Sequence, residues 1–476
     1  MSEKEIHNIF NDNITRREML KLMGTTTVAG LMGISLPEVT RAASLSHKEK
    51  PNIIFILSDN CRWDCMGFMG HPFIKTPGLD RLASEGVVLE NAFNTNSLCS
   101  PSRASILTGT YAHTHGVLNN HTPWTGQKPT FFEYLKKAGY DTAFIGKWHM
   151  PGKGLPEMPY LDLFVSYTYR EGQGSYFNCP LIVNGKPEPS QKAYITEEVT
   201  HRAIEFMKER IKPDGSRSPF CIYLSHRTAH PPFHAPKGIA GMYNDSKVEL
   251  PEVVDSWFSR TNGNVYQGIM MGSYENQYRR YCEVITAMDR DIQHLLEQID
   301  QLGLRDNTII IYMSDNGMMW GEHRRHGIKY PYEESIRLPF IVRCPWLIPD
   351  IGTRRSQMAL NIDIAPTLLD IAGVAIPSGM EGQSLVPILR DSEISGRNAW
   401  LLEYWKYYPE NFPSYFGVRT ETHKYIEYEK TLKPELFDLV NDPGEQHNLY
   451  GTPEGEKLLP ELKKMLEALK SGKKLL

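Results

Sequence analysis

Short apolar runs that end abruptly in polar residues are the clearest pattern along the chain. Asn52–Leu57 and Thr308–Met313 are two such runs, rich in isoleucine and without charged residues. Their length and composition are typical of parallel strands buried on both faces. The pattern also predicts strands at Tyr140–Ile145 and Pro219–Leu224 and helices at Pro77–Glu85, Arg103–Leu107, Phe131–Ala138, Ala193–Glu209 and Tyr278–Leu302, and it continues at Phe340–Val342 and Asp363–Ile371. Alternation on this scale predicts an α/β fold with a large, mainly parallel sheet flanked by helices.

This alternation ends at about Arg390, and shorter elements follow it. Short strands joined by tight turns are expected at Ala399–Trp405, Tyr415–Thr420, His423–Tyr428 and Glu435–Asp438. A charged helix is expected at Glu454–Lys470. Together they predict a smaller C-terminal antiparallel sheet with one helix. Because no repeat or low-complexity linker separates the two parts, we expect them to share an interface.

Residues 1–44 have the features of a processed leader. Thr15–Lys21 contains an arginine pair and resembles a bacterial twin-arginine export signal. The uncharged stretch Leu22–Leu36 is too short for a stable membrane span, and Thr40–Ala42 offers a cleavage site between small residues. We therefore expect export to the periplasm or secretion. An ordinary basic N-terminus or an uncleaved anchor is the alternative.

Composition indicates a globular protein, and the net charge bears on which partners to expect. With 476 residues, of which 41% are hydrophobic and 23% charged, the chain is typical of a soluble globular protein. The net charge of −4 gives no electrostatic reason to expect nucleic acid as a partner. Its seven cysteines are Cys61, Cys65, Cys99, Cys179, Cys221, Cys282 and Cys344, an odd number that disulfides cannot fully use. We expect most of them to be buried free thiols.

Two similar polar triplets follow the two apolar runs. Ser58–Asn60 follows the first run and Ser314–Asn316 the second, so each predicted strand ends in Ser-Asp-Asn. Open α/β sheets bind ligands at the carboxyl ends of their strands. Two carboxylates and two amide oxygens at such an edge suit Ca²⁺ or Mg²⁺ rather than zinc. These candidate ligands are Asp59, Asn60, Asp315 and Asn316. The alternative is that they are only favoured turn residues at strand exits.

The most specific motif is Cys99–Gly109, Cys-Ser-Pro-Ser-Arg-Ala-Ser-Ile-Leu-Thr-Gly. Its key positions are Cys99, Pro101, Arg103, Thr108 and Gly109. At residue frequencies of about 5% each, these five positions match by chance in on the order of one in ten thousand chains of this length. Here the sequence resembles the sulfatase family, in which this cysteine is oxidised to Cα-formylglycine by a maturation enzyme. The resemblance implies that Cys99 becomes an aldehyde and also serves as a metal ligand.

Two further segments match sulfatase motifs. The resemblance of Gly146–His149 implies that Lys147 holds the sulfate or the aldehyde hydrate. It also implies that His149 is the base that later breaks the hemiacetal. His230–Phe233 matches His-x-Pro-Phe, which implies that His230 protonates or binds the leaving ester oxygen. Taken alone, either segment is also compatible with a surface turn or a structural histidine.

A third match lies downstream, and two positions depart from the family pattern. Gly321–Glu334 resembles Gly-Glu-His…Lys…Tyr-Glu, which implies that Lys329 is a second cation on the sulfate. Arg324–His326 replaces the commoner glycine after Gly-Glu-His. This basic run is either a solvated patch or a recognition site for an acidic substrate. At the first metal pair the family usually has Asp-Asp, and Asn60 here removes one negative charge.

Taken together, the resemblance is nearest to N-acetylglucosamine-6-sulfatase-like polysaccharide sulfatases with an alkaline-phosphatase-like fold. It implies a hydrated formylglycine, held by Ca²⁺ and Arg103, that attacks sulfur while Ca²⁺, Lys147 and Lys329 neutralise charge on the sulfuryl oxygens. We expect an export signal at 1–44, a sulfatase catalytic domain at 45–392 and a C-terminal α+β subdomain at 393–476. The expected partner is a sulfated saccharide, from a glycosaminoglycan or an algal polysaccharide. Candidates for sugar contacts are His113, His115, His121, Arg324 and His423.

Two other functions remain open at this point. A phosphonate or phosphate ester hydrolase of the same superfamily would share the fold. A secreted glycan-binding protein that has lost catalysis would share it too, although every charged catalytic residue type is retained. Side-by-side assays of sulfate and phosphate esters distinguish a sulfatase from a phosphonate or phosphate ester hydrolase. The chemical state of Cys99 distinguishes an active sulfatase from a glycan-binding protein.

Overall fold

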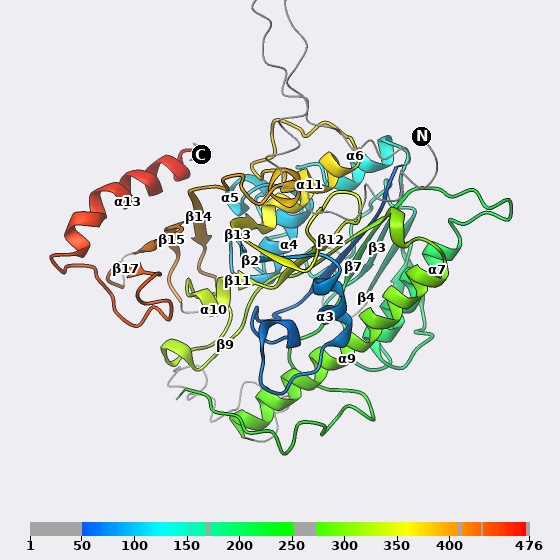
Figure 1. Ribbon diagram of the computed structural model, residues 1–476, viewed down its shortest axis with the longest axis horizontal. Helices are drawn as coiled ribbons and strands as arrows, with labels where there is room; N and C mark the ends of the chain where they lie inside the picture. Colours follow the sequence, from blue (N-terminus) through cyan, green and yellow to red (C-terminus); the bar gives the residue numbers. More distant parts are fainter. Residues whose placement is uncertain are drawn as a thin grey trace, which may run out of the picture. The chain divides into compact units, whose positions relative to one another are not determined.

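A computed structural model of the chain describes residues 50–152, 154–167, 172–251, 273–407, 412–429 and 432–472 (Figure 1). The export signal predicted at 1–44 lies outside these residues. The described residues all fall within one unit, Ser46–Leu476. Among them, no helix has both the length and the apolar character that crossing a membrane requires.

The predicted apolar runs build the centre of the large sheet. β1 (Asn52–Ser58) lies between β8 (Thr308–Ser314) and β7 (Phe220–Ser225) and runs parallel to both. β3 (Asp141–Gly146) and β4 (Leu163–Tyr167) continue in parallel beyond β7. Every residue of β1, β7 and β8 is buried, as expected for strands covered on both faces. The predicted α/β fold is confirmed.

Further strands extend this sheet at both flanks, most of them by antiparallel pairing, so the whole sheet is mixed. The additional strands are β2 (Val87–Phe93), β11 (Arg337–Leu338), β12 (Phe340–Arg343) and β13 (Thr353–Leu360) on one side and β5 (Leu181–Val183) and β6 (Lys186–Glu188) on the other. The sequence pattern did not predict β2, because Glu90 and Asn91 interrupt its apolar run. It did not predict β13 either, because exposed and half-buried polar side chains fill the first part of that strand.

Alternate side chains of β1 enter two different cores. Ile54 and Ile56 pack with α3 (Pro77–Ser84), α7 (Ile195–Lys208) and α9 (Tyr274–Gln301). The opposite face of β1 packs with α4 (Cys99–Thr108), α6 (Phe131–Lys137) and α11 (Ile364–Ile371). Each fully buried aliphatic side chain contributes about 1.5–3 kcal/mol to folding. These two helical layers therefore hold the strands firmly and fix the positions of the loops that follow them.

The predicted C-terminal sheet is also confirmed. It consists of β14 (Ala399–Tyr404), β15 (Tyr415–Thr420), β16 (His423–Tyr428) and β17 (Glu435–Asp438), all antiparallel, with α13 (Gly455–Lys470) on one face. The other face packs Trp400 and Leu402 against Phe93 of β2, so the two sheets share an interface as expected. The remaining short elements are α5 (Ala112–His115), α10 (Glu333–Ile336), α12 (Val386–Arg390), β9 (Met319–Trp320) and β10 (His326–Gly327).

Candidate active site

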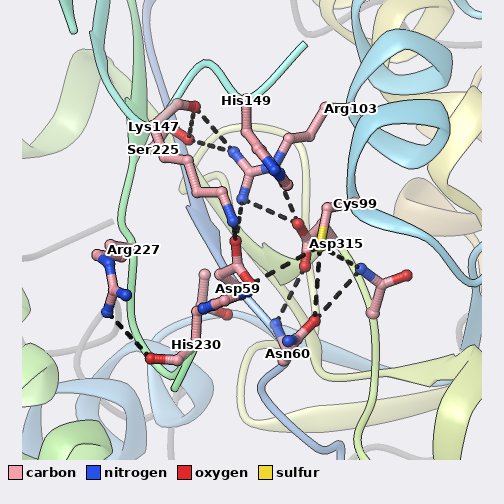
Figure 2. Close-up of polar contacts among 12 residues, drawn as sticks. Asp59, Asn60, Cys99, Arg103, Lys147, His149, Ser225, Arg227, His230 and Asp315 are labelled. Carbon is pink, nitrogen blue, oxygen red and sulfur yellow. Dashed lines mark hydrogen bonds and ion pairs between the residues drawn. The ribbon is translucent and has the colours of Figure 1, made fainter. Parts of the chain in front are cut away.

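The polar triplets after β1 and β8 meet at the carboxyl edge of the sheet. Ser58 and Ser314 are register partners at the ends of the two strands. The residues that follow them, Asp59 and Asp315, therefore come side by side. α4 begins at Cys99 and brings its thiol to the same place (Figure 2).

Arg103 on α4 ties these strand ends together. It donates from Nε to Asp315 Oδ2 and from Nη2 to Asp59 Oδ2, both at 2.9 Å. Its Nη1 donates to the carbonyl of Lys147 at 2.9 Å and to Ser225 Oγ at 2.7 Å. The arginine and both carboxylates are fully buried, where an unpaired charge would cost several kcal/mol. Arg103 therefore fixes the distance between the two carboxylates (Figure 2).

Oxygen atoms converge on the Cys99 thiol. Asp59 Oδ1 and Asn60 Oδ1 lie 4.0 and 3.9 Å from Cys99 Sγ, and one ligand atom each of Asp59, Cys99 and Asp315 lies within 4.8 Å of the others. Such oxygen donors suit a hard cation such as Ca²⁺. The Asn316 amide nitrogen lies 3.6 Å from Cys99 Sγ, so this amide would have to turn over to add an oxygen ligand. We call Asp59, Asn60, Cys99, Asp315 and Asn316 the Cys99 cluster.

Burial governs the electrostatics of this cluster. Burial raises the pKa of the Cys99 thiol well above its usual value, and the charges of Asp59 and Asp315 raise it further. Burial also raises the pKa of Asp315 to about 6, with the charge of Asp59 adding to the effect. For Asp59 itself, burial opposes ionisation, but the positive groups around it, led by Lys147, lower its pKa. An unmodified Cys99 is therefore a protonated thiol and a poor nucleophile.

The turn after β3 brings two predicted residues to the site. Gly146 has a φ of 119°, and a Cβ there would lie 1.9 Å from the carbonyl oxygen of Ser225, so only glycine fits. The ammonium of Lys147 then forms a fully buried ion pair with Asp59. Burial and the charge of Lys147 lower the pKa of His149 well below its usual value, and its buried Nδ1 lacks a hydrogen-bond partner among the described residues. His149 is thus a buried neutral imidazole.

His230 lies in the loop after β7, and Arg227 shapes that loop. Arg227 donates to the carbonyls of His230 at 3.1 Å and Pro231 at 2.9 Å, and its guanidinium carbon lies 4.5 Å from the ring centroid of Tyr176. Burial lowers the pKa of His230 to about 3, with the charge of Lys147 adding to the effect. A bound anion would oppose this shift. Arg227 could not be predicted from a motif, because its hydrogen-bond partners are backbone carbonyls.

Lys329 and Arg324 lie in the loops before α10. The N–H of Lys329 donates to Ser97 Oγ at 3.4 Å, two residues before Cys99, and its ammonium lies 5.7 Å from the ring centroid of Tyr330. Arg324 ends a short 3₁₀ turn and has a φ of 59°. The backbone of Lys329 is therefore close to the start of α4.

Three of the histidines predicted to contact sugar form hydrogen bonds within the protein. His113 Nδ1 lies 2.7 Å from Glu403 Oε2, which joins α5 to β14. His115 is buried, and both of its ring nitrogens are hydrogen-bonded within the protein. His423 begins β16, and its Nδ1 lies 2.8 Å from Thr422 Oγ1. His115 therefore has no ring nitrogen left for a ligand, whereas sugar contacts of His113 and His423 stay predictions.

Comparison with known proteins agrees with this geometry. The family model for Sulfatase matches residues 51–374, and that for N-sulphoglucosamine sulphohydrolase, C-terminal, matches residues 321–472. An N-acetylglucosamine-6-O-sulfatase of Bacteroides thetaiotaomicron is 30% identical, over 94% of this chain and 91% of that protein. An ulvan-active sulfatase of Formosa agariphila is also 30% identical, over 95% of this chain and 89% of that protein.

Solved structures show the same fold. One, in complex with its substrate D-glucosamine-2-N,6-O-disulfate, has a TM-score of 0.80 at 29% identity and covers 89% of this chain and 98% of its own. The phosphonate monoester hydrolase of Agrobacterium radiobacter has a TM-score of 0.72 at 21% identity, over 88% of this chain and 95% of its own, a likeness of fold alone. Because the sulfatase model covers most of the chain and the relatives match nearly its full length, the chain belongs to the sulfatase family of enzymes.

Proposed function

We propose that this sulfatase is exported and hydrolyses sulfate esters of a carbohydrate, with position 99 as the source of the nucleophile. The observation that carries the proposal is the place of Cys99, buried beside the carboxylates of Asp59 and Asp315 and next to Arg103. The substrate class follows from relatives named for N-acetylglucosamine 6-O-sulfate and ulvan and from the structure bound to a disulfated glucosamine. A glycosaminoglycan or algal polysaccharide fragment is therefore the substrate we expect.

Two groups would complete the site. Formylglycine at position 99 would supply a hydrated aldehyde as the nucleophile toward sulfur. Ca²⁺, held by the Cys99 cluster, would draw charge from the sulfuryl oxygens. The charges present fit this role, because Arg103 and Lys147 already balance Asp59 and Asp315. A divalent cation therefore gives the pocket a net positive charge, which favours an anionic sulfate ester.

The protein's own side chains bind the sulfate and move protons. Lys147 and Lys329 place positive charge on the sulfuryl oxygens. His230 gives a proton to the ester oxygen as the bond between that oxygen and sulfur breaks, so that the sugar leaves as a neutral alcohol. His149, whose Nδ1 has no partner among the described residues, takes up a proton when sulfate departs. Arg103 holds both carboxylates in place throughout.

The remaining parts of the proposal concern maturation and organisation. Residues 1–44 direct export by the twin-arginine route, to the periplasm or outside the cell, and a formylglycine-generating enzyme oxidises Cys99. Catalysis lies in residues 45–392. Residues 393–476 form the C-terminal subdomain, whose Trp400 and Tyr415 pack in one core with Tyr330 and Tyr332 from the loop before α10.

Steady-state kinetics on the full chain, produced together with a formylglycine-generating enzyme, test this function. We expect sulfate release from N-acetylglucosamine 6-sulfate or ulvan oligosaccharides, and little phosphate release from the matching phosphate esters. Cys99→Ala should abolish turnover with the fold retained, whereas Cys221→Ala, which removes a buried thiol of β7, should remain active. Near-normal activity of Cys99→Ala, or release of phosphate in preference to sulfate, would contradict the proposal.

A further inference from the structure

The three residues of the basic run Arg324–His326 lie in different environments. The Nδ1 atom of His326 lies 3.0 Å from Tyr274 Oη, and its ring centroid lies 5.1 Å from that of Trp320. Arg324 is exposed, whereas Arg325 is half-buried. An exposed arginine stays hydrated, but a half-buried one has lost part of its contact with water. Of the two arginines, Arg325 is therefore the one whose charge gains more from a partner.

Aromatic rings hold the side chain of Arg325. Its guanidinium carbon lies 5.5 Å from the ring centroid of Tyr330 and 5.9 Å from that of Phe412. An aromatic ring attracts a guanidinium but does not take up its N–H donors. No carboxylate of the described residues forms an ion pair with Arg325, and none of their acceptors takes a hydrogen bond from its guanidinium.

Two carboxylates of this region have other partners. Glu322, three residues before Arg325, pairs with Arg62 at 2.5 Å. Glu435 accepts a hydrogen bond from Tyr428 Oη at 2.6 Å. Within the described residues, Arg325 is thus held in place by rings and has no counterion. An anionic ligand would supply the counterion and would meet a fork of donors that suits paired hydrogen bonds to its oxygens.

The same ring connects Arg325 with the candidate active site. The ammonium of Lys329 lies 5.7 Å from the ring centroid of Tyr330, so the two cationic groups are at most 11.2 Å apart, the sum of the two distances to that ring. The N–H of Lys329 donates to Ser97 Oγ, two residues before Cys99. A saccharide whose sulfate ester reaches Lys329 therefore has its other substituents near Arg325.

We propose that Arg325 binds a second anionic group of the substrate, one that is not cleaved, and so selects saccharides with at least two acidic groups. This inference rests on the proposed function, in which Lys329 holds the sulfate that is released. A sulfate on the same sugar and a carboxylate on the neighbouring sugar offer the same chemistry to a guanidinium.

Such a residue has a kinetic signature of its own. A group that does not react is bound equally before and in the transition state, so loss of its partner raises KM and leaves kcat unchanged. A hydrogen bond to a charged group contributes enough to change affinity by about 10–100-fold. If Arg325 only covered the rings of Tyr330 and Phe412, its removal would affect every substrate to the same extent.

The test compares wild type with Arg325→Met, which keeps an apolar side chain against the rings. The substrates are N-acetylglucosamine 6-sulfate, D-glucosamine-2-N,6-O-disulfate and a disaccharide with a uronate next to the 6-sulfated sugar. We expect KM to rise about 10–100-fold for at least one of the two substrates with a second anion, and that substrate identifies the source of the anion. For the singly charged sugar, KM should stay within about twofold of wild type, and so should kcat throughout.

Arg324→Met is the matched control, because it removes the exposed neighbour of Arg325, and it should leave all values unchanged. Salt provides a measurement on the wild type itself: KM of the affected substrate should rise more steeply with ionic strength than KM of the singly charged sugar.

An equal loss on all substrates, an unchanged KM on both doubly charged substrates, an equal effect of Arg324→Met or equal salt dependence would overturn the role of Arg325 while leaving the sulfatase proposal intact. A wild-type protein that hydrolyses none of the three would overturn both.

Discussion

Removing Arg103 should destabilise the protein far more than removing a surface arginine that also pairs with two carboxylates. Arg103→Ala leaves Asp59 and Asp315 buried with a large share of their positive charge gone. Breaking one partner out of a buried ion pair costs about 3–5 kcal/mol, because the remaining charge stays uncompensated in a medium of low dielectric constant. Lys147 still contacts Asp59, so the loss should fall mainly on Asp315.

The assay is urea unfolding, with the free energy taken from the midpoint and slope of each transition. Arg81→Ala is the control, since Arg81 pairs with Glu85 and Asp300 near the surface, where each such pair is worth about 0–1 kcal/mol. Adding Asp315→Asn to Arg103→Ala should restore part of the loss, because it removes the carboxylate left unpaired. If Arg103→Ala cost no more than Arg81→Ala, or if Asp315→Asn made the double variant worse, the reasoning about this site would be refuted.

Three further predictions follow from other contacts. Lys424 is buried between Glu333 at 3.2 Å and Glu445 at 2.5 Å, so Lys424→Met should lower the free energy of unfolding in urea by about 3–5 kcal/mol. The control Lys470→Met removes an exposed lysine and should lower it by about 0–1 kcal/mol; equal losses would contradict this. Gly146→Ala should lower stability and activity more than Gly185→Ala. Both glycines have positive φ, but a Cβ at Gly146 would lie 1.9 Å from a backbone oxygen, whereas a Cβ at Gly185 would meet open space. Gly185→Ala should therefore lower the free energy of unfolding by only about 1–2 kcal/mol. The hydrogen bond with Glu403 raises the pKa of His113 above 6.5, so this pair stabilises the fold below pH 6.5 and loses its effect as the pH rises through the raised value. Urea midpoints should therefore fall with rising pH less steeply in His113→Asn than in wild type or in His201→Asn, and an unchanged slope would speak against the pairing.

The two strands that carry the site could be predicted because both are continuous apolar runs that end in polar residues. β1 and β8 are apolar throughout, and Ser-Asp-Asn follows at the same register in each, so local pattern alone placed Asp59 and Asp315 at one edge. β2 and β13, which pair in parallel with each other on one flank of the sheet, escaped prediction because polar residues interrupt their apolar runs. In these strands the neighbouring strand, rather than the residue pattern, determines the structure.

Contacts between residues far apart in the sequence also limited what could be predicted about the site. The pairing of His113 with Glu403 could not be predicted, because Glu403 lies 290 residues further along the chain and no local pattern joins them. Burial of His115 is likewise a property of the folded chain. Gln173 carries no motif, and only the folded loop brings it to His230. The Cys99 cluster, Arg103 and Lys147 were predictable from motifs and spacing, whereas Arg227, which shapes the loop of His230, was not.

The most direct measurement is the mass of the tryptic peptide 82–103, taken from protein made in its native host. This peptide ends at Arg103 and contains Cys99. If position 99 supplies the nucleophile, the peptide should be lighter than its unmodified sequence by the difference between a thiol and an aldehyde side chain. A peptide of unmodified mass, isolated from protein that releases sulfate from a sugar, would contradict the central claim.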